Sequence, residues 1–433
     1  MYTLLLLAFV LGYACIALEH TIKIDKAATA ILTGVVCWTV LVIGQQTFFP
    51  GGPEEGFIEE SILEHVGEIA EILFFLLAAM TIVELIDTHG GFEIITSRIR
   101  TNNRVKLLWI LGFVTFFLSS VLDNLTTTIV MATLLRKLIG DREDLWFFGG
   151  IVVVAANAGG AWSPIGDVTT IMLWIGGQVT AVNIVLSLLL PSLVCLLVPL
   201  AIVSFTKRGT IEAPSDTADH GHGVEVPRRE SSLILWLGIA ALLFVPVFKN
   251  LTHLPPFMGM LLSLGTLWVV TEILHRHKPD DERHSLSVAH VIRRIDTPSI
   301  LFFLGILLAV ASLQTTGLLS RFATVLDESF GSVYLINIVI GLVSAIVDNV
   351  PLVAGAMGMY TLDTFPPDSD FWELLAYCAG TGGSALIIGS AAGVAMMGIL
   401  RIDFLWYLKR ITGLALAGYF SGVAVYYLLN GLV

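Results

Sequence analysis

Residues 119–128 read SSVLDNLTTT and place Asp123-Asn124 between two apolar segments. No polar loop separates these segments, and the second has about eleven residues before Arg136. At ~1.5 Å per helical residue, such a segment is too short to cross a hydrocarbon core of ~30 Å. We therefore predict a re-entrant hairpin over 107–135, with Asp123 and Asn124 at its tip and protein or a wet cavity around it.

The same pattern returns in the second half of the chain. Residues 344–351 read SAIVDNVP, and they predict a second hairpin over 332–360 with Asp348-Asn349 at its tip. The halves match elsewhere in the same order, at offsets of 223–228 residues. The matches are ILFFL at 72–76 and 300–304, Asp-Asn at 123–124 and 348–349, Gly-Gly at 159–160 and 382–383, and Gly166 with Gly389. Ordered matches at a nearly constant offset predict an internal repeat.

The composition is that of a membrane protein. The chain has 433 residues, of which 56% are hydrophobic and 13% charged, whereas soluble domains carry about 25% charged residues. Its apolar residues form long runs, and runs of ~20 residues are typical of membrane helices. The net charge of −12 argues against a nucleic-acid partner. The 4 cysteines are scattered and show no spacing typical of zinc sites or disulfide scaffolds.

The repeat predicts an inverted topology. Each half holds seven apolar segments, so the second half must enter the membrane from the opposite side. We predict an all-α membrane protein with repeats over 1–205 and 231–433 and a cytoplasmic linker over 206–230. Each repeat has about five transmembrane helices, one re-entrant hairpin and discontinuous helices at the ion site. Inverted repeats are a signature of secondary transporters, whose site lies where the repeats meet.

The distribution of positive charge fits this topology with both termini on the outer side. All of the 23 lysines and arginines except Lys249 and Arg321 fall in the predicted inner loops, as the positive-inside rule requires. The acidic stretch 49–69 is then an outer loop. The first twenty residues lack a basic n-region and predict a spanning helix rather than a signal peptide. We expect a multi-pass protein of a bacterial inner (plasma) membrane.

Two apolar runs are interrupted at matching positions, over 146–176 and 371–400. The first contains Pro164, which removes a backbone donor, together with glycines that relax the helix. Unwound backbone there frees carbonyl oxygens. Paired interruptions of this kind are the best pointer in a sequence to the binding site of a transporter.

The polar groups at these interruptions suit a hard cation, because they are carboxylates, amides and hydroxyls rather than thiols or imidazoles. Acids inside a membrane mark ion pathways or proton relays. Burial raises a carboxylate pKa and a nearby cation lowers it, so one carboxylate can hold either a proton or a sodium ion. The candidate ion-binding and proton-coupling residues are Asp123, Asn124, Thr126, Asn157, Ser163, Asp167, Thr169, Thr170, Asp348, Asn349, Thr381, Ser384 and Ser390. Among these, the expected ligands of Na⁺ or Li⁺ are Asp123, Asn124, Asn157 and Asp167.

Structural roles remain open for several of these residues. The aspartates can cap broken helix ends, and Thr and Ser hydroxyls can bond back into their own helices. Four further residues, His65, Glu68, Glu71 and Glu84, are candidates for a proton path or for pH sensing. Among them, Glu84 is the candidate for the proton path, and His65 with Glu68 and Glu71 for pH sensing, whereas solvation at the helix end suits the nearby Asp87.

The stretches 119–128, 157–170 and 344–351 resemble the NhaD-type sodium/proton antiporters of the ion transporter superfamily. The resemblance implies two inverted repeats of five crossings and one hairpin each, and a homodimer whose scaffold helices hold a moving transport domain. It also implies exchange of Na⁺ or Li⁺ for H⁺, without a cofactor. Because Asp167 aligns with Ser390, we expect the main ion site in the first half.

Two other functions remain as alternatives. Dicarboxylate carriers of the superfamily carry a neutral Ser-Asn-Thr at the hairpin tips, whereas Asp-Asn here repels an anion and attracts a cation. A sodium-coupled anion symporter would also need a basic or hydroxyl-rich anion pocket, and the sequence shows no buried Arg or Lys. An intramembrane aspartyl protease could use two buried Asp residues. However, Pro164-Ile165-Gly166-Asp167 lacks the first glycine of a GxGD signature, and we predict a transporter rather than an enzyme.

Overall fold

The computed structural model describes the whole chain except residues 54–55, 98, 100, 207–208, 212–225 and 431–433. Every helix or strand element of the described residues is an α-helix, and one isolated bridge joins Asn103 to Thr210. Nine of the described helices are long and apolar enough to cross a membrane. The chain is therefore an all-α, multi-span membrane protein, as the apolar runs predict.

The helices of the first half end at Thr206, and those of the second half begin at Arg228. Most of the predicted linker 206–230 thus lies outside the described residues. The first-half helices are α1 (Tyr2–Ala17), α2 (Glu19–Ile22), α3 (Lys26–Ile43), α4 (Gln45–Phe48), α5 (Phe57–Thr88), α6 (Gly91–Thr96), α7 (Arg104–Leu122), α8 (Asn124–Leu138), α9 (Arg142–Ala161), α10 (Val168–Ile175) and α11 (Ala181–Thr206). The second-half helices are α12 (Arg228–Thr252), α13 (Pro256–His275), α14 (Asp280–Ser285), α15 (Val288–Val291), α16 (Thr297–Thr315), α17 (Leu318–Phe330), α18 (Val333–Val343), α19 (Asn349–Met359), α20 (Asp370–Gly382), α21 (Ala391–Leu400), α22 (Phe404–Arg410) and α23 (Thr412–Asn430).

The acidic stretch 49–69 is not the outer loop that its composition predicts. Helix α5 begins at Phe57 and runs for 32 residues, which at ~1.5 Å per residue is longer than a ~30 Å hydrocarbon core. Glu59 and Glu60 lie in its first turn, where carboxylates interact favourably with the helix dipole. Glutamate is also a good helix former, so an acidic sequence here extends the apolar helix beyond the core instead of ending it.

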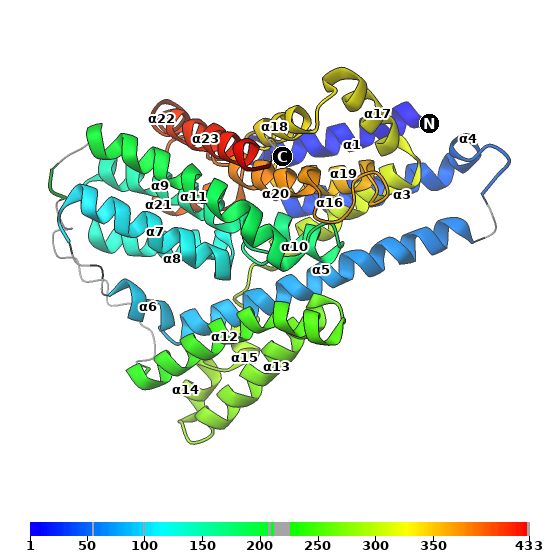
Figure 1. Ribbon diagram of the computed structural model, residues 1–433. Helices are drawn as coiled ribbons and strands as arrows, with labels where there is room; N and C mark the ends of the chain where they lie inside the picture. Colours follow the sequence, from blue (N-terminus) through cyan, green and yellow to red (C-terminus); the bar gives the residue numbers. More distant parts are fainter. Residues whose placement is uncertain (54–55, 98, 100, 207–208, 212–225, 431–433) are drawn as a thin grey trace.

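Both Asp-Asn pairs lie where one helix ends and the next begins. Helix α7 ends at Leu122 and α8 begins at Asn124, so Asp123 alone joins them, and α8 runs back beside α7 (Figure 1). The second arm has 15 residues rather than about eleven. In the second half, α18 and α19 have 11 residues each, and Asp348 is the residue immediately before α19.

The predicted interrupted runs are broken helices. Helix α9 ends at Ala161, and α10 begins at Val168 after an irregular stretch that contains Pro164. Helix α20 ends at Gly382, and α21 begins at Ala391. Helices α9 and α20 lie at the centre of the protein, since every residue from Trp146 to Ala161 and from Phe371 to Gly382 is buried.

The helices form two packed groups (Figure 1). The frame helices are α1, α3, α5, α12, α13 and α16, of which α3 packs on α16 and α5 packs on α13 and α16. The core helices are α7–α11, α18–α21 and α23, of which α11 packs on α23 and α7 on α9. Contacts between the groups include those of α19 with α16 and of α10 with α5.

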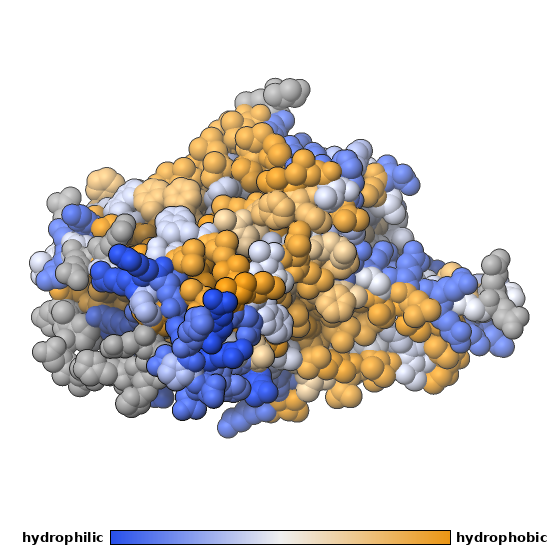
Figure 2. Space-filling view, turned by 90° about the horizontal axis from the view of Figure 1, so that it is seen from below, coloured by the Kyte–Doolittle hydropathy of each residue, from blue (hydrophilic) through white to orange (hydrophobic). Residues whose placement is uncertain are grey.

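Apolar side chains cover the middle of the face shown in Figure 2, and hydrophilic side chains gather toward its two ends. Large exposed apolar residues lie along several helices, including Leu186 and Phe205 of α11 and Leu251 of α12. A broad exposed apolar surface is costly in water, so this distribution is typical of a surface that faces lipid.

Candidate ion site

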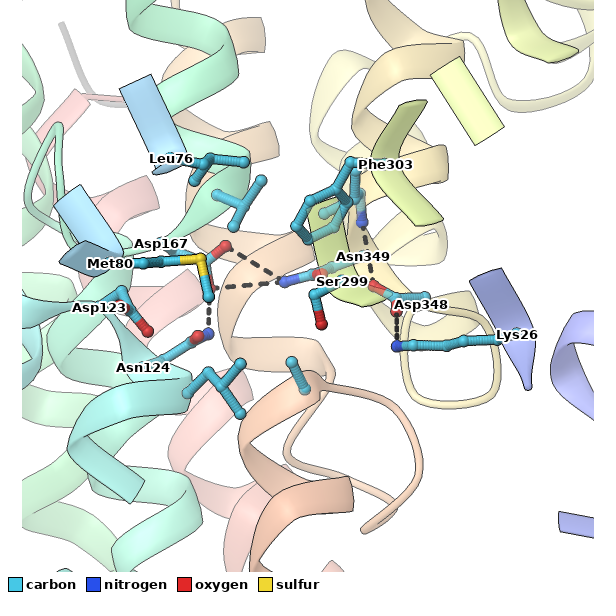
Figure 3. A pocket seen from close by; sticks show the side chains of 14 residues that line it. Lys26, Leu76, Met80, Asp123, Asn124, Asp167, Ser299, Phe303, Asp348 and Asn349 are labelled. Atoms are coloured by element: carbon cyan, nitrogen blue, oxygen red, sulfur yellow. Dashed lines mark hydrogen bonds and ion pairs between the residues drawn. The ribbon is translucent and has the colours of Figure 1, made fainter. Parts of the chain in front are cut away.

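A small cavity lies on the border between the frame and core helices, and the predicted aspartates meet there (Figure 3). Its volume of about 40 Å³ has room for roughly three water molecules. The residues that line it are Lys26, Leu76, Met80, Asp123, Asn124, Leu125, Asp167, Val168, Ser299, Phe303, Asp348, Asn349, Val350 and Ala391. Five of the thirteen candidate ion-site residues, two from each Asp-Asn pair and Asp167, thus line a single cavity.

Asp167 joins the two Asp-Asn pairs. Asn124 donates its amide N–H to Oδ2 of Asp167, and Asn349 donates to Oδ1 and Oδ2 at 3.3 and 3.4 Å (Figure 3). Oδ1 also accepts from the backbone N–H and hydroxyl of Thr169, at 2.9 and 2.8 Å. This carboxylate is 1% exposed. Its charge is therefore stabilised by four donor groups, of which two come from asparagines in opposite halves of the chain.

Asp123 lies in an unusual backbone conformation. Its φ of 85° and ψ of 159° fall in a region used almost only by glycine, which costs of order 1–3 kcal/mol. The side chain caps α8, because Oδ1 accepts from the backbone N–H of Thr126 and Oδ2 from its hydroxyl, both at 2.8 Å. Capping and a place in the cavity are thus combined in one residue rather than being alternatives.

Asp348 forms an ion pair with Lys26 across the two groups of helices. Nζ of Lys26 lies 3.3 Å from Oδ2 of Asp348 (Figure 3). The charge count assigns Lys26 to an inner loop, but the structure places it as the first residue of α3, after the N-cap residue Asp25. Sequence reasoning therefore missed Lys26, which is half-buried and lines the cavity. The sequence signal that could have indicated this is the position of Lys26 at the very start of an apolar run.

Four core helices begin at the cavity, namely α8, α10, α19 and α21, and their first residues line it. Asp123, Asp167, Asp348 and Ser390 are the N-caps of these helices, and each side chain accepts from a backbone N–H of its helix. Helix N-termini carry partial positive charge. The partial charges of the helix ends therefore face the carboxylates, and the carboxylates supply the negative charge that attracts a cation.

Asn157 connects the cavity with the second broken helix. Its Oδ1 accepts from Asn124 at 3.2 Å, and its amide N–H groups donate to the hydroxyls of Ser384 and Ser390, both at 2.9 Å. Asn157, Ser384 and Ser390 are buried, and none of the three lines the cavity. Through Asn157, the two serines help to hold the amide of Asn124 in place. The hydrogen-bond network therefore includes residues of both halves of the chain.

The remaining hydroxyls of the candidate set bond to backbone carbonyls. Ser163 donates to the carbonyl of Ser120 at 2.6 Å, Thr170 to that of Asp167 at 2.8 Å, and Thr381 to that of Tyr377 at 2.6 Å. None of the three lines the cavity. The hydroxyls of Thr170 and Thr381 thus bond back locally, as the structural alternative has it, whereas that of Ser163 bonds to the end of α7.

The four candidates for a proton path or pH sensing all lie on α5 and outside the cavity lining. His65 contacts Glu68 at 3.4 Å and the hydroxyl of Thr315 at 3.2 Å. Glu84 pairs with Arg294 at 3.2 Å. Glu71 lies between them on α5. The same helix sends Leu76 and Met80, which sequence reasoning missed because they are ordinary apolar residues, to the cavity.

Comparison of the sequence with known proteins shows which family the chain resembles. The citrate transporter family matches residues 13–375. Sodium/proton antiporter 1 of Arabidopsis thaliana is 49% identical over 428 residues, which cover 98% of this chain and 72% of the relative. Sodium/proton antiporter 2 of the same plant is 46% identical over 433 residues, which cover 97% and 98%. The Na⁺/H⁺ antiporter NhaD of Vibrio cholerae is 31% identical over 455 residues, which cover 98% and 91%.

These relatives are named antiporters and not enzymes, and no name among them indicates a cofactor. The predictions of a transporter rather than an enzyme and of no cofactor agree with them. These three matches each cover 97% or 98% of this chain. The chain belongs to the family of NhaD-type sodium/proton antiporters, within the wider citrate transporter family.

Proposed function

We propose that this protein exchanges Na⁺ or Li⁺ for H⁺ across its membrane. The observation that carries the proposal is the convergence of three carboxylates, those of Asp123, Asp167 and Asp348, on one small cavity. With Lys26, the three carboxylates and one ammonium give the lining a formal charge of −2 when all are ionised. Such a cavity attracts a cation and disfavours an anion. The names of the relatives agree with this substrate.

The exchange follows from competition for the same oxygens. A hard cation binds carboxylate and amide oxygens, and a proton binds the same carboxylates. Asn124 and Asn349 each offer an N–H donor at one side of the amide and a carbonyl oxygen at the other. When the side-chain amide of Asn124 or Asn349 rotates, its N–H no longer donates to Asp167, and its carbonyl oxygen becomes an additional ligand for Na⁺. Protons on the carboxylates remove the charge that holds the cation, so one ion leaves as the other binds.

The proposed inverted repeats cover 1–205 and 231–433. Contacts that recur at matching positions support them. Ser119 of α7 donates to the carbonyl of Ala156 at 2.6 Å, and Ser344 donates to the carbonyl of Ala379 at 2.8 Å. A Cβ at Gly160 would lie 2.5 Å from the carbonyl oxygen of Gly166, and one at Gly383 2.7 Å from that of Gly389. We propose re-entrant hairpins over 107–135 and 332–360, and ion-site interruptions within 146–176 and 371–400.

Transport would proceed by alternating access of the elevator type, with the core helices moving against the frame helices. The cavity lies on the border of the two groups, since α3, α5 and α16 line one side and α8, α10, α19 and α21 the other. Movement of one group past the other would carry Asp123, Asp167 and Asp348 between the two faces of the membrane. The ion pair of Lys26 with Asp348 crosses this border.

The proposed setting is an inner (plasma) membrane, with a lipid bilayer around the frame and both termini on the outer side. The positive-inside distribution of Lys and Arg supports this orientation. A bacterial origin remains part of this proposal, because relatives are found in plants as well as in bacteria. We also propose a homodimer, in which frame helices of two copies pair and leave the core helices free to move.

A sodium-coupled symporter of dicarboxylates or other anions is the second candidate. Two observations favour it, namely the ammonium of Lys26 at the cavity and the match to the citrate transporter family. The ammonium is already paired with Asp348 at 3.3 Å, so a carboxylate substrate would have to displace a fixed one. The intramembrane protease has less support, because Asp123 and Asp167 serve as N-caps of different helices.

Purified protein in sealed vesicles with a trapped pH dye tests the proposal. A pH gradient, acid inside, is imposed, and NaCl, LiCl, KCl or choline chloride is added outside. We expect Na⁺ and Li⁺ to collapse the gradient and choline to leave it unchanged. If no cation moves protons, sodium-driven uptake of labelled citrate or succinate would establish the symporter and overturn the antiport proposal.

A further inference from the structure

A second polar cluster lies away from the ion cavity, where the ends of three frame helices meet. His89 follows the last residue of α5, Glu230 lies in the first turn of α12, and His275 is the last residue of α13. The side chains are almost fully enclosed, with exposed fractions of 0% for His89, 2% for His275 and 10% for Glu230. Neither the proposed exchange nor the sequence motifs use these residues.

The three side chains present their polar atoms to one another. Nε2 of His89 lies 3.3 Å from Nε2 of His275, which lies 2.8 Å from Oε1 of Glu230. One ligand atom from each residue lies within 4.8 Å of the other two. In a tetrahedral site with bonds of about 2.0 Å, the ligand atoms are separated by roughly 3.3 Å. The cluster is therefore close to the spacing of three metal ligands.

Hydrogen bonds fix how the imidazole ring of His89 faces the cluster. Nδ1 of His89 lies 2.7 Å from the carbonyl oxygen of Leu85, so it carries the proton and leaves the lone pair of Nε2 facing His275. A proton on Nε2 of His275 can point at His89 or at Glu230, but not at both. A histidine that donates its other N–H to a backbone carbonyl is the usual arrangement of a metal ligand.

We propose that His89, His275 and Glu230 form a binding site for a divalent transition-metal ion of the Zn²⁺ type. Two imidazoles and one carboxylate suit this ion, with a water as fourth ligand. The site differs in chemistry from the ion cavity, where oxygen ligands suit Na⁺. Nζ of Lys278 lies 2.6 Å from Oε1 of Glu230. When the metal binds, Lys278 either keeps its hydrogen bond to this carboxylate or moves away, so that the oxygen becomes a metal ligand.

The metal ion would tie the end of α5 to α12 and α13. Met80 of α5 lines the ion cavity, and it precedes His89 by nine residues, or roughly 13 Å along the helix axis. The tie would therefore hold in place a frame helix on which the core helices move. This inference does not depend on which ion the cavity transports.

The test uses full-length protein in detergent, with any affinity tag removed and metals stripped with a chelator. Zn²⁺ is then added at micromolar concentration, and bound zinc per chain and the unfolding temperature are measured. We expect about one zinc per chain and a higher unfolding temperature, as for any ligand of the native state. His275→Gln and Glu230→Gln should each lose the zinc. His284→Ala, at an exposed histidine, is the matched control and should retain it.

Co²⁺ provides a second measurement on the wild-type protein alone, because its visible absorption reports four-coordinate binding with nitrogen and oxygen ligands. This readout holds even where a variant of a buried histidine folds poorly. Wild-type protein that takes up neither Zn²⁺ nor Co²⁺ at micromolar concentration would overturn the proposal. Equal zinc content in the wild type and in folded His275→Gln would do the same.

Discussion

Nζ of Lys26 lies 3.3 Å from Oδ2 of Asp348, whereas Asp123, at the corresponding hairpin tip, bonds to Thr126 of its own helix. The two tips share their sequence but not their partners. In the second half the carboxylate faces a fixed cation that belongs to a frame helix. A transported Na⁺ at Asp348 must therefore compete with the ammonium of Lys26, while at Asp123 it meets no such competitor among the described hydrogen bonds and ion pairs.

Replacing Lys26 with Met should increase the apparent affinity for Na⁺. Met has a similar length but no charge, so Asp348 is left free to interact with the transported cation. We expect the half-saturating Na⁺ concentration to fall roughly threefold, because a partly exposed ion pair contributes ~0.2–1 kcal/mol. The measurement is the initial rate of Na⁺-driven proton release from vesicles as a function of Na⁺ concentration.

Lys409→Met is the control for this experiment, since Lys409 is exposed near the end of α22, away from the cavity lining. Its half-saturating concentration should equal that of the wild type. An unchanged value in Lys26→Met would show that the ion pair does not compete with Na⁺, and that Lys26 serves only to hold α3 against the second hairpin.

Removing the charge at either tip should abolish exchange while the protein still folds. Asn is isosteric with Asp and is an equally good N-cap, so Asp123→Asn and Asp348→Asn keep the ends of α8 and α19. Each variant lacks a carboxylate that can take up either a proton or a cation. We expect at least a tenfold loss of Na⁺-driven proton flux at an unchanged elution volume in size-exclusion chromatography. Wild-type flux in both variants would rule out the proposed site.

The membrane class and the lining aspartates could be predicted from the sequence because they rest on local signals. Long apolar runs indicate spanning helices, and an Asp-Asn pair inside such a run indicates a functional turn. Helix α17 is not among the segments that the apolar runs predict, because Arg321, Asp327 and Glu328 interrupt its apolar residues. Its amphipathic pattern would have indicated a helix.

Partners that are distant along the chain could not be predicted in the same way. Lys26 and Asp348 are 322 residues apart, and a charge count sees only that Lys26 precedes an apolar run. The same holds for Asn349 and Asp167, which are 182 residues apart. A single sequence does not show which distant residues are in contact. The amide of Asn349 reaches the carboxylate of Asp167 only because α19 packs against α10.

Asn124 and Asn349 should act jointly, because both donate to Asp167. We expect Asn124→Ala and Asn349→Ala each to raise the half-saturating Na⁺ concentration by about tenfold, and the double variant to lose less than the product of the two. Residues that share a partner commonly show interaction energies of ~0.5–3 kcal/mol. The measurement is the complete double-mutant cycle of half-saturating concentrations. Asn250→Ala, at an exposed position, is the control and should match the wild type.

Strictly multiplicative effects in this cycle would contradict a shared site. They would indicate that each amide supports its own hairpin tip and that Asp167 is not the point where the two halves are coupled. In that case Asp167→Asn should leave the Na⁺ dependence unchanged and lower only the unfolding temperature, as expected for the loss of a helix cap.

The matched glycine contacts give a test of the repeat that does not depend on transport. A Cβ at Gly159 would collide with the carbonyl oxygen of Phe116, and a Cβ at Gly382 with that of Gly341. Backbone cannot yield as a flexible side chain does, so Gly159→Ala and Gly382→Ala should each destabilise the protein by ~1–3 kcal/mol. Gly265 of α13 has no atom within 4 Å of an added Cβ, and Gly265→Ala should be neutral or stabilising by up to ~1 kcal/mol.

Thermal unfolding of the three variants in detergent distinguishes the possibilities. If the two halves repeat one packing motif, Gly159→Ala and Gly382→Ala should lower the unfolding temperature by similar amounts, and Gly265→Ala should not lower it. A loss at Gly159 alone would mean that α20 does not approach α18 as closely as α9 approaches α7. The two halves would then share sequence motifs without sharing the contact that holds each hairpin against its broken helix.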